Sequence, residues 1–270
     1  MAPAFRIMGI VNVTPDSFSD GGEWFERDAA IAHGLELATE GASILDVGGE
    51  STRPFAEPVP AEEELARVIP VVATLAEAGV AQVSVDTMKL EVARAALDAG
   101  ATYVNDVTAF RHEPDIAGLV AERGCDCCLM HMLGEPRTMQ VDPRYDDVVA
   151  EVTAFLEERA GFAMREGVAK ERISVDPGIG FGKTVAHNLE LVRRLDEIAE
   201  LGFTVLLGTS RKGFLGRLLQ REDPHERVFG TVATNVIGLE RGARVFRVHD
   251  VAATADALTV AAATLGRDGA

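Results

Sequence analysis

The feature of this sequence that most constrains its fold is a repeated alternation of short apolar runs with longer helical patterns. Eight apolar runs predict strands at residues 5–11, 43–47, 82–85, 103–104, 127–130, 173–175, 204–207 and 245–248. Helical patterns follow them at residues 29–40, 61–78, 90–99, 115–123, 143–167, 186–198, 225–241 and 254–265. Eight strand–helix units in 270 residues predict an α/β fold, a parallel (β/α)₈ TIM barrel rather than an open doubly wound sheet.

The helix ends and the continuity of the chain agree with this fold. Six helical patterns close on the glycine that commonly ends a helix, at Gly41, Gly79, Gly100, Gly124, Gly167 and Gly202. No linker or low-complexity segment divides the chain, so we expect residues 1–270 to form a single domain.

The loop after the sixth predicted strand is rich in glycine. Residues 173–175 form a short, mainly apolar run, Asp176 and Pro177 follow it, and glycines stand at 178, 180 and 182 before a helical pattern near Val185. Such glycines let the backbone approach a ligand or another segment closely. The loop fits neither common nucleotide motif, because Pro177 replaces the first glycine of a P-loop and Lys183 replaces the third glycine of the dinucleotide fingerprint. Asp176 either shapes the turn or faces a ligand, and this stretch alone leaves both interpretations open.

Composition excludes several classes of function. A formal net charge of −17 and a pI near 4.8 disfavour binding to nucleic acid or to acidic membranes. No apolar run approaches the roughly 18 residues of a membrane helix, and residues 1–6 lack a signal-peptide pattern, so we expect a cytoplasmic protein. The cysteines at 125, 127 and 128 are odd in number, and only His131 is near them, so we expect buried thiols rather than disulfides or a metal site.

Polar residues follow every predicted strand. In order they are Asn12, Asp46 to Glu50, Asp86 and Thr87, Asn105 and Asp106, His131, Asp176, Gly208 to Lys212, and Arg247 to Asp250. The carboxyl ends of the strands form the active-site face of a (β/α)₈ barrel, so these side chains are expected to surround one pocket. Thr87 and Asp250 are the two for which capping the next helix is the expected role.

The pocket is expected to have two chemically different sides. Asp86, Asn105 and Asp176 supply acceptors and a donor suited to a planar heterocycle with an N–H edge, although a polar network that only closes the barrel mouth remains an alternative. The cationic side consists of Arg53, Arg211, Lys212, Arg247 and His249. Because loops after strands seven and eight of such barrels often hold phosphate, this side predicts a phosphate or pyrophosphate anion. Surface ion pairing is the alternative, above all for Arg211.

At these positions the chain resembles the dihydropteroate synthases, a pterin-binding TIM-barrel family. The resemblance rests on residues 12–22, 46–54, 84–87, 105–107, 129–132 with 138–140, 176–183, 210–212 and 247–251, which occur in the family's order. It implies the condensation of 6-hydroxymethyl-7,8-dihydropterin diphosphate with 4-aminobenzoate to 7,8-dihydropteroate and pyrophosphate, in folate biosynthesis. It also implies a Mg²⁺ cofactor, a homodimer, and an enzyme of the kind that sulfonamides target.

The resemblance assigns roles to individual residues. The pterin would contact Asp86, Asn105, Met130, Asp176, Phe181 and Lys212, and the diphosphate would contact Asn12, Arg247 and His249, with Asn12 also binding the metal. Phe18, Thr52, Arg53, Pro54 and Ser210 would surround 4-aminobenzoate. Asp86, Asp176, Lys212, Arg247 and His249 would act in catalysis, by stabilising a cationic pterin and the departing diphosphate. The mechanism needs no nucleophilic side chain, and no serine or cysteine stands in a convincing triad.

One departure from the family pattern leaves other hypotheses open. Phe55 stands where the family usually has glycine, which puts the arylamine pocket in question but not the pterin site. A pterin-binding paralogue without synthase activity is therefore an alternative. A corrinoid-dependent methyltransferase would share the barrel and the pterin residues, but it would need neither residues 12–22 nor the anion site at Arg247 and His249.

Overall fold

The structure is a closed eight-stranded parallel barrel, as the strand–helix alternation predicted. The computed structural model describes residues 4–13, 22–51, 57–134 and 138–267, without the side chains of residues 22–26. Each strand pairs with the next in sequence, and β8 pairs with β1 to close the barrel. The strands are β1 (Arg6–Asn12), β2 (Ile44–Gly48), β3 (Gln82–Asp86), β4 (Tyr103–Asp106), β5 (Asp126–Met130), β6 (Ile173–Asp176), β7 (Thr204–Leu207) and β8 (Ala243–Val248). All eight predicted strands are present, with ends that shift by two residues at most.

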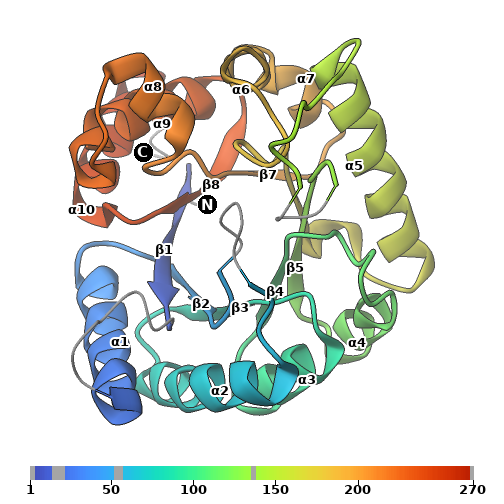
Figure 1. Cartoon of the computed structure of the whole chain (residues 1–270), viewed down its shortest axis with the longest axis vertical. Helices are drawn as coiled ribbons and strands as arrows, with labels where there is room; N and C mark the ends of the chain where they lie inside the picture. The colour runs from blue at the N-terminus through green and yellow to red at the C-terminus, as the bar shows by residue number, and fades with distance from the viewer. Residues whose placement is uncertain (1–3, 14–21, 52–56, 135–137, 268–270) are drawn as a thin grey trace.

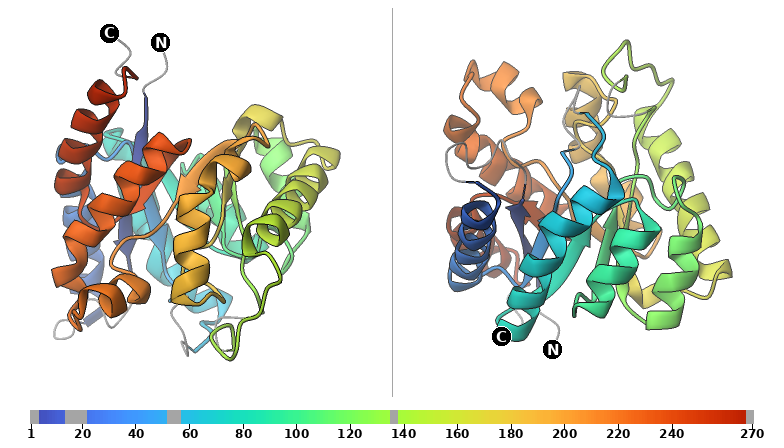
Figure 2. Two further views of the ribbon diagram at one scale, coloured as in Figure 1. Left: turned by 90° about the horizontal axis from the view of Figure 1, so that it is seen from above. Right: turned by 60° about the horizontal axis from the view of Figure 1, so that its bottom comes forward.

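A ring of helices surrounds the strands (Figure 1). The α-helices are α1 (Gly22–Thr39), α2 (Ala61–Ala78), α3 (Leu90–Asp98), α4 (Asp115–Arg123), α5 (Val148–Arg165), α6 (Val185–Arg193), α7 (Leu195–Ala199), α8 (Gly213–Leu219), α9 (Val228–Glu240) and α10 (Val251–Thr264). The 3₁₀ helices η2 (Lys170–Arg172) and η3 (Pro224–Arg227) precede β6 and α9. The start of β1 and the end of α10 lie at the same end of the barrel (Figure 2).

Three predicted helices have other boundaries in the structure. The helix expected at 143–167 begins only at Val148, because the Asp147 side chain caps it by accepting from Val149 N at 2.9 Å and Ala150 N at 3.1 Å. The helix expected at 186–198 is divided at Arg194 into α6 and α7. The helix expected at 225–241 is η3 followed by α9.

Other helical segments were missed or shortened by the prediction. Helix α8 was not predicted at all, because its seven residues are too few to show helical periodicity. Helix α1 begins at Gly22 rather than at residue 29, and α10 begins at Val251 rather than at residue 254. The glycines expected at helix ends do adopt positive φ, which a side chain rarely tolerates, at Gly41, Gly79, Gly100, Gly124, Gly167 and Gly202.

The core has two parts, one inside the barrel and one outside it. Inside, six strands contribute a small apolar cluster of Met8, Ile44, Tyr103, Cys128, Leu206 and Val245. Outside, a much larger cluster fills the layer between the strands and the helices. Because both faces of the strands are covered, the strands are nearly continuous apolar runs. The three cysteines are free and buried, as predicted, and burial raises the pKa of the Cys127 and Cys128 thiols.

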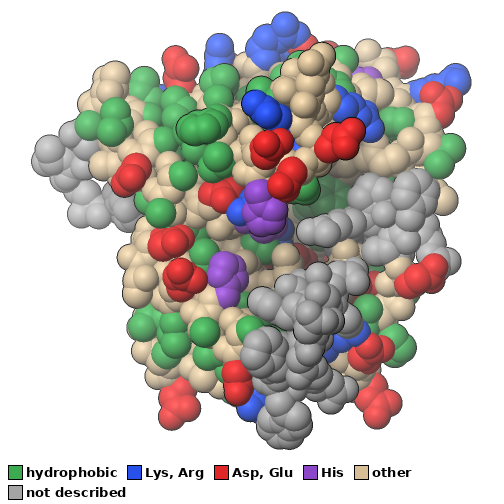
Figure 3. Space-filling view, turned by 60° about the vertical axis from the view of Figure 1, so that its left-hand side comes forward, with side chains coloured by type: hydrophobic (Ala, Val, Ile, Leu, Met, Phe, Trp, Pro, Cys, Tyr) green, Lys and Arg blue, Asp and Glu red, His purple; other side chains and the backbone are tan. Residues whose placement is uncertain are grey.

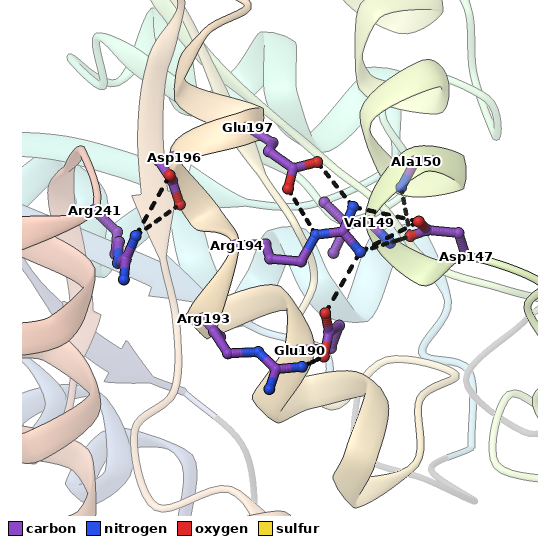
Figure 4. Close-up of polar contacts among 9 residues, drawn as sticks. All are labelled: Asp147, Val149, Ala150, Glu190, Arg193, Arg194, Asp196, Glu197 and Arg241. Atoms are coloured by element: carbon purple, nitrogen blue, oxygen red, sulfur yellow. Dashed lines mark hydrogen bonds and ion pairs between the residues drawn. The ribbon is translucent and has the colours of Figure 1, made fainter.

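Charged residues on the helices tie neighbouring units together. Arg194, between α6 and α7, pairs with Asp147 at the start of α5 (Figure 4). It also pairs with Glu190 in α6 and with Glu197 in α7. Acidic side chains are spread across the face seen in Figure 3 among basic and apolar ones. In the parts of the chain that the structure describes, no helix is long and apolar enough to cross a membrane.

The contact between α9 and the barrel makes a first prediction. A Cβ on Gly238 would lie 2.3 Å from Cδ2 of the fully buried Leu207, so Gly238→Ala should lower the free energy of unfolding by about 1–3 kcal/mol through overpacking. Gly118, inside α4, has no atom within 4 Å of such a Cβ, so Gly118→Ala should instead stabilise the protein by about 0.5–1 kcal/mol. Urea denaturation of both variants checks this. Equal stability of the two would contradict the packing at Gly238.

Candidate active site

Parallel pairing brings the polar strand ends to one end of the barrel. The register places Asn12 beside Gly48, Gly48 beside Asp86, and Asp86 beside Asn105. On the other side of the mouth, Met130 lies beside Asp176. The residues that the sequence grouped into one pocket are therefore neighbours at the carboxyl ends of their strands.

A buried network joins four strands at this mouth. Asp46 is fully buried and accepts from Ser84 Oγ at 2.6 Å, Asn105 Nδ2 at 2.9 Å and Arg247 Nε at 2.6 Å. Arg247 also donates from Nη2 to Asp86 Oδ2 at 2.6 Å. The polar network that the sequence left as an alternative thus exists, and it includes two of the three residues predicted to bind a heterocycle.

A second charged pair lies across the mouth, where Asp176 and Lys212 converge over Gly208. A Cβ on Gly208 would stand 3.7 Å from Asp176 Oδ2 and 3.8 Å from Lys212 Nζ. Lys212 Nζ donates to Ile179 O and lies 4.7 Å from the centre of the Phe181 ring. A Cβ at this position would thus contact both the carboxylate and the ammonium group, and the ammonium group in turn lies near an aromatic ring.

The turn after β6 answers the question that the sequence left open about Asp176. Its Oδ1 accepts from Gly178 N at 2.7 Å, so this carboxylate does shape the turn, while Oδ2 is directed toward Gly208. Gly178 has φ +66°, and a Cβ there would lie 1.8 Å from His131 O. The predicted close approach is thus between the glycine loop and the end of β5.

One wall of the mouth is apolar. Met130, predicted to contact a pterin, clusters with Val107, Met132 and Met139, and Phe181 packs against them. Phenylalanine presents a flat ring and methionine a flexible, polarizable thioether, so this wall suits the face of a planar ring.

Burial strongly perturbs the charged groups of the site. It raises the pKa of Asp86 to about 7 despite the opposing effect of Arg247, and it raises the pKa of Asp176 despite Lys212. Burial lowers the pKa of Lys212 to about 8, although Asp176 opposes this. Asp46 and Asp86 together outweigh burial at Arg247 and raise the pKa of its guanidinium, so this cation stays charged.

The loops after β7 and β8 are joined by two side-chain pairs, Ser210 with His249 and Arg211 with Asp250. Ser210 Oγ lies 2.9 Å from His249 Nδ1 and accepts from His249 N at 3.0 Å. Arg211 forms a two-bond ion pair with Asp250, so it is ion-paired as its alternative interpretation proposed, but the two side chains are only 20% and 19% exposed rather than at the surface.

The two residues expected to cap helices do not do so. The Asp250 side chain makes no capping bond to α10, because it is engaged by Arg211. Thr87 Oγ1 accepts from Lys89 N at 3.2 Å within the loop before α3, where Lys89 holds the cap position. Both predictions of capping were wrong.

Some predicted site residues cannot be located, and one cluster beside them was missed. Phe18, Thr52, Arg53 and Pro54, together with Phe55, lie outside the described residues. The described chain next to them is anchored by Lys89, which pairs with both Glu50 and Glu64. The sequence did contain a signal for this cluster, because Glu64 lies on the apolar face of the helical pattern at residues 61–78.

A buried His–Lys pair was also missed. Lys183 Nζ lies 2.9 Å from His131 Nδ1 and donates to Phe181 O at 3.0 Å. Burial lowers the pKa of both, that of His131 to about 2. The histidine therefore stays neutral, and its contact with Lys183 links the end of β5 to the glycine loop. The sequence did not reveal this pair, because His131 and Lys183 are far apart in the chain.

Metal ligands are sparse in this site. Across the residues that the structure describes, no group of three or more His, Cys, Asp or Glu side chains is placed to hold a metal ion. The Asn12 amide, at the end of β1, is hydrogen-bonded to none of those residues. A single amide oxygen fits Mg²⁺, which commonly takes one or two protein ligands together with substrate phosphates and water.

These features define a class of protein, a (β/α)₈ barrel with buried carboxylates, an amide and cations at the carboxyl ends of its strands. Residues 8–249 match the family model of the pterin binding enzymes. The chain is 47% identical over 260 residues to the dihydropteroate synthase of Escherichia coli K12, covering 96% of this chain and 92% of that one. This chain belongs to the pterin binding enzyme family.

Solved structures agree with this assignment. The dihydropteroate synthase of Xanthomonas albilineans, solved with 4-aminobenzoic acid, is 53% identical, with a TM-score of 0.91, over 96% of this chain and 93% of that one. The Yersinia pestis dihydropteroate synthase, in complex with a sulfonamide drug, is 42% identical, with a TM-score of 0.91, over 97% and 94% of the two chains.

The raised pKa of Asp86 makes a second prediction. Because the folded protein binds this proton more tightly than the unfolded chain, the stability linked to it is full below the ordinary aspartate pKa of 3.8 and is lost as pH rises through about 7. Asp86→Asn cannot titrate, so its free energy of unfolding relative to wild type should rise between about pH 4 and about pH 8, by at most about 4 kcal/mol. Urea denaturation at both pH values measures this. A stability difference independent of pH would contradict the raised pKa.

Proposed function

We propose that this chain is a dihydropteroate synthase, which condenses 6-hydroxymethyl-7,8-dihydropterin diphosphate with 4-aminobenzoate to give 7,8-dihydropteroate and pyrophosphate. The observation that carries the proposal is the convergence of Asp176 and Lys212 over Gly208, in a chain of the pterin binding enzyme family. The relatives named above are all dihydropteroate synthases, which favours this reaction over methyl transfer by a corrinoid enzyme.

The pterin occupies the mouth between the carboxylates. Asp176 Oδ2 and Asp86 accept from the N–H groups of the ring, Asn105 adds an amide, and Lys212 donates to ring acceptors. Met130 and Phe181 contact its face, which the apolar wall of the mouth supports. Charged donors and acceptors in so buried a site make strong, directional hydrogen bonds.

The diphosphate binds at Arg247 and His249. Arg247 donates from Nε and Nη2 within the protein, and none of the described residues accepts from its Nη1, which is available to an anion. His249 is oriented by Ser210. Asn12 would hold Mg²⁺ together with the diphosphate oxygens, and the metal would neutralise charge on the leaving group.

The reaction proceeds by departure of diphosphate before attack of the arylamine. Cleavage of the carbon–oxygen bond leaves a cationic methylene conjugated to the dihydropterin ring. Asp86 and Asp176 stabilise that positive charge, and Arg247 and His249 stabilise the departing anion. The amine of 4-aminobenzoate then attacks the methylene and loses a proton, which completes the product.

The second substrate is proposed to bind among Phe18, Thr52, Arg53, Pro54 and Ser210. The Xanthomonas albilineans enzyme was solved with 4-aminobenzoic acid, which supports this substrate. The Yersinia pestis enzyme was solved with a sulfonamide, so we propose that this chain is also a sulfonamide target. Phe55 adjoins this group, and no observation in the described residues favours the inactive paralogue over the synthase.

An activity assay tests the proposal. Wild type with dihydropterin diphosphate, Mg²⁺ and 4-aminobenzoate should release pyrophosphate and dihydropteroate in equal amounts. Lys212→Ala should lower kcat/KM for the pterin substrate by about 100-fold or more, because a buried charged donor is lost. Lys170→Ala is the matched control, since Lys170 lies over the Phe203 ring at 4.9 Å but precedes β6, at the other end of the barrel.

The outcomes of this assay are distinct. Pterin binding without product would overturn the synthase proposal and identify a binding paralogue. Product formed only by Phe55→Gly would place the defect next to Pro54. Equal activity of Lys212→Ala and Lys170→Ala would remove Lys212 from the site.

We further propose that the chain forms a homodimer through the outer face of α8, α9 and α10. Large apolar side chains are exposed there, including Leu218, Phe229, Ile237 and Val260, and Phe229 is 83% exposed. A groove of about 730 Å³ between α9 and α10 adds to this face. An apolar surface of this kind commonly marks an interface.

Light scattering tests the dimer. Wild type should have twice the mass of one chain, and Phe229→Asp should shift the population toward the monomer, because a charge would be buried without a partner. Val80→Asp, at a 52% exposed valine between α2 and β3, should leave the mass unchanged. A monomeric wild type would contradict this proposal.

The domain organisation and the cellular location are also proposals. We propose that residues 1–270 form a single domain, which is supported by the pairing of β1 with β8 near the two ends of the chain. We also propose a cytoplasmic location, supported by three cysteines that are buried and unpaired, as is usual in a reducing compartment.

A further inference from the structure

Asp46 is a buried acid that none of the roles above uses. It lies inside β2 with no exposed surface, so it cannot reach a substrate in the mouth. Its three partners come from three other strands, Ser84 from β3, Asn105 from β4 and Arg247 from β8. Two of those partners are proposed to touch the substrate.

The bond to Asn105 decides which way that amide faces. Asp46 Oδ2 accepts from both Asn105 Nδ2 and Arg247 Nε, at 2.9 Å and 2.6 Å. A flipped amide would bring the Asn105 oxygen against a carboxylate oxygen, which is repulsive and would leave a buried acceptor without a donor. The NH₂ group is therefore held toward Asp46, and the amide oxygen is left to accept from another donor.

The bond to Arg247 fixes the plane of the guanidinium group. Asp46 holds Nε and Asp86 holds Nη2, so two points of the rigid fork are set by two strands. The remaining nitrogen, Nη1, has its direction fixed as a result. A guanidinium group pre-oriented in this way loses less side-chain freedom when it binds an anion.

We propose that Asp46 is a positioning residue of this site, which holds Asn105 with its oxygen ready to accept an N–H of the heterocycle and holds Arg247 in the orientation that binds the diphosphate. Asp46 itself touches neither substrate. The inference rests on the proposed function, because it assigns a pterin and a diphosphate to Asn105 and Arg247.

A neighbouring acid provides a matched comparison. Asp106 is equally buried and also lies at the barrel mouth, but its carboxylate closes a local turn. It accepts from Thr108 N and Oγ1 at 2.7 and 2.8 Å and from Phe110 N at 2.9 Å. Asp106→Asn thus alters a buried acid without changing the partners of Asn105 or Arg247.

Binding of separate ligand fragments tests the proposal. Titration calorimetry with 6-hydroxymethyl-7,8-dihydropterin, and separately with pyrophosphate and Mg²⁺, should show both dissociation constants raised by about 10-fold or more in Asp46→Asn. Asp106→Asn should leave both near wild type. The KM for 4-aminobenzoate, at saturating pterin substrate, should stay within about twofold of wild type in Asp46→Asn, because loss of general packing would affect every ligand.

A double-mutant cycle separates positioning from general loss of structure. If Asp46 acts on the pterin through Asn105, adding Asp46→Asn to Asn105→Ala should raise the dihydropterin dissociation constant no further. Additive effects would overturn the proposal. So would equal affinities of Asp46→Asn and wild type, whereas failure of wild type to bind dihydropterin would overturn the proposed function instead.

A measurement on the wild-type protein covers the case in which Asp46→Asn does not fold. The side-chain amide signals of Asn105 can be identified in ¹⁵N spectra by their absence in Asn105→Asp. The amide proton bonded to Asp46 should exchange slowly with solvent in the ligand-free protein. Fast exchange, as for an exposed asparagine, would overturn the proposed orientation.

Discussion

The site depends on one shared cation, the guanidinium group of Arg247 between Asp46 and Asp86. Burial of these carboxylates near each other would be costly without it, because an unpaired charge in a protein interior is strongly destabilising. The ion pairs of Arg247 with Asp46 and Asp86 are possible only because the barrel closes. Closure brings the end of β8 next to β1 and within reach of β2 and β3. The network at the mouth therefore requires the closed barrel.

A second charged pair, Asp176 with Lys212, faces this network across the mouth. Burial raises the pKa of the acid and lowers that of the lysine, and each group opposes the effect of burial on the other. A substrate that brings its own N–H groups and its own anion would share both pairs. Although the net charge of the protein is −17, the buried carboxylates of Asp46 and Asp86 hold the Arg247 cation at this mouth.

The regular elements were predictable where local periodicity was strong. All eight strands follow from mainly apolar runs, because strands covered on both faces are rich in apolar residues. Helix boundaries were less predictable: α5 starts late because the Asp147 side chain caps it, and the helical pattern at residues 186–198 is divided at Arg194. Helix α8 was missed because two turns carry too little periodicity.

The sequence alone determined the barrel, the polar end of every strand and the position of the glycine turn, since each depends on residues close together in the chain. Only the tertiary structure decided which polar groups are partners. Arg247 lies 201 residues from Asp46, and Lys183 lies 52 residues from His131. Asp250 bonds Arg211 rather than its own helix. Such choices depend on strand register and barrel closure, which place distant side chains within bonding distance and which no local pattern records.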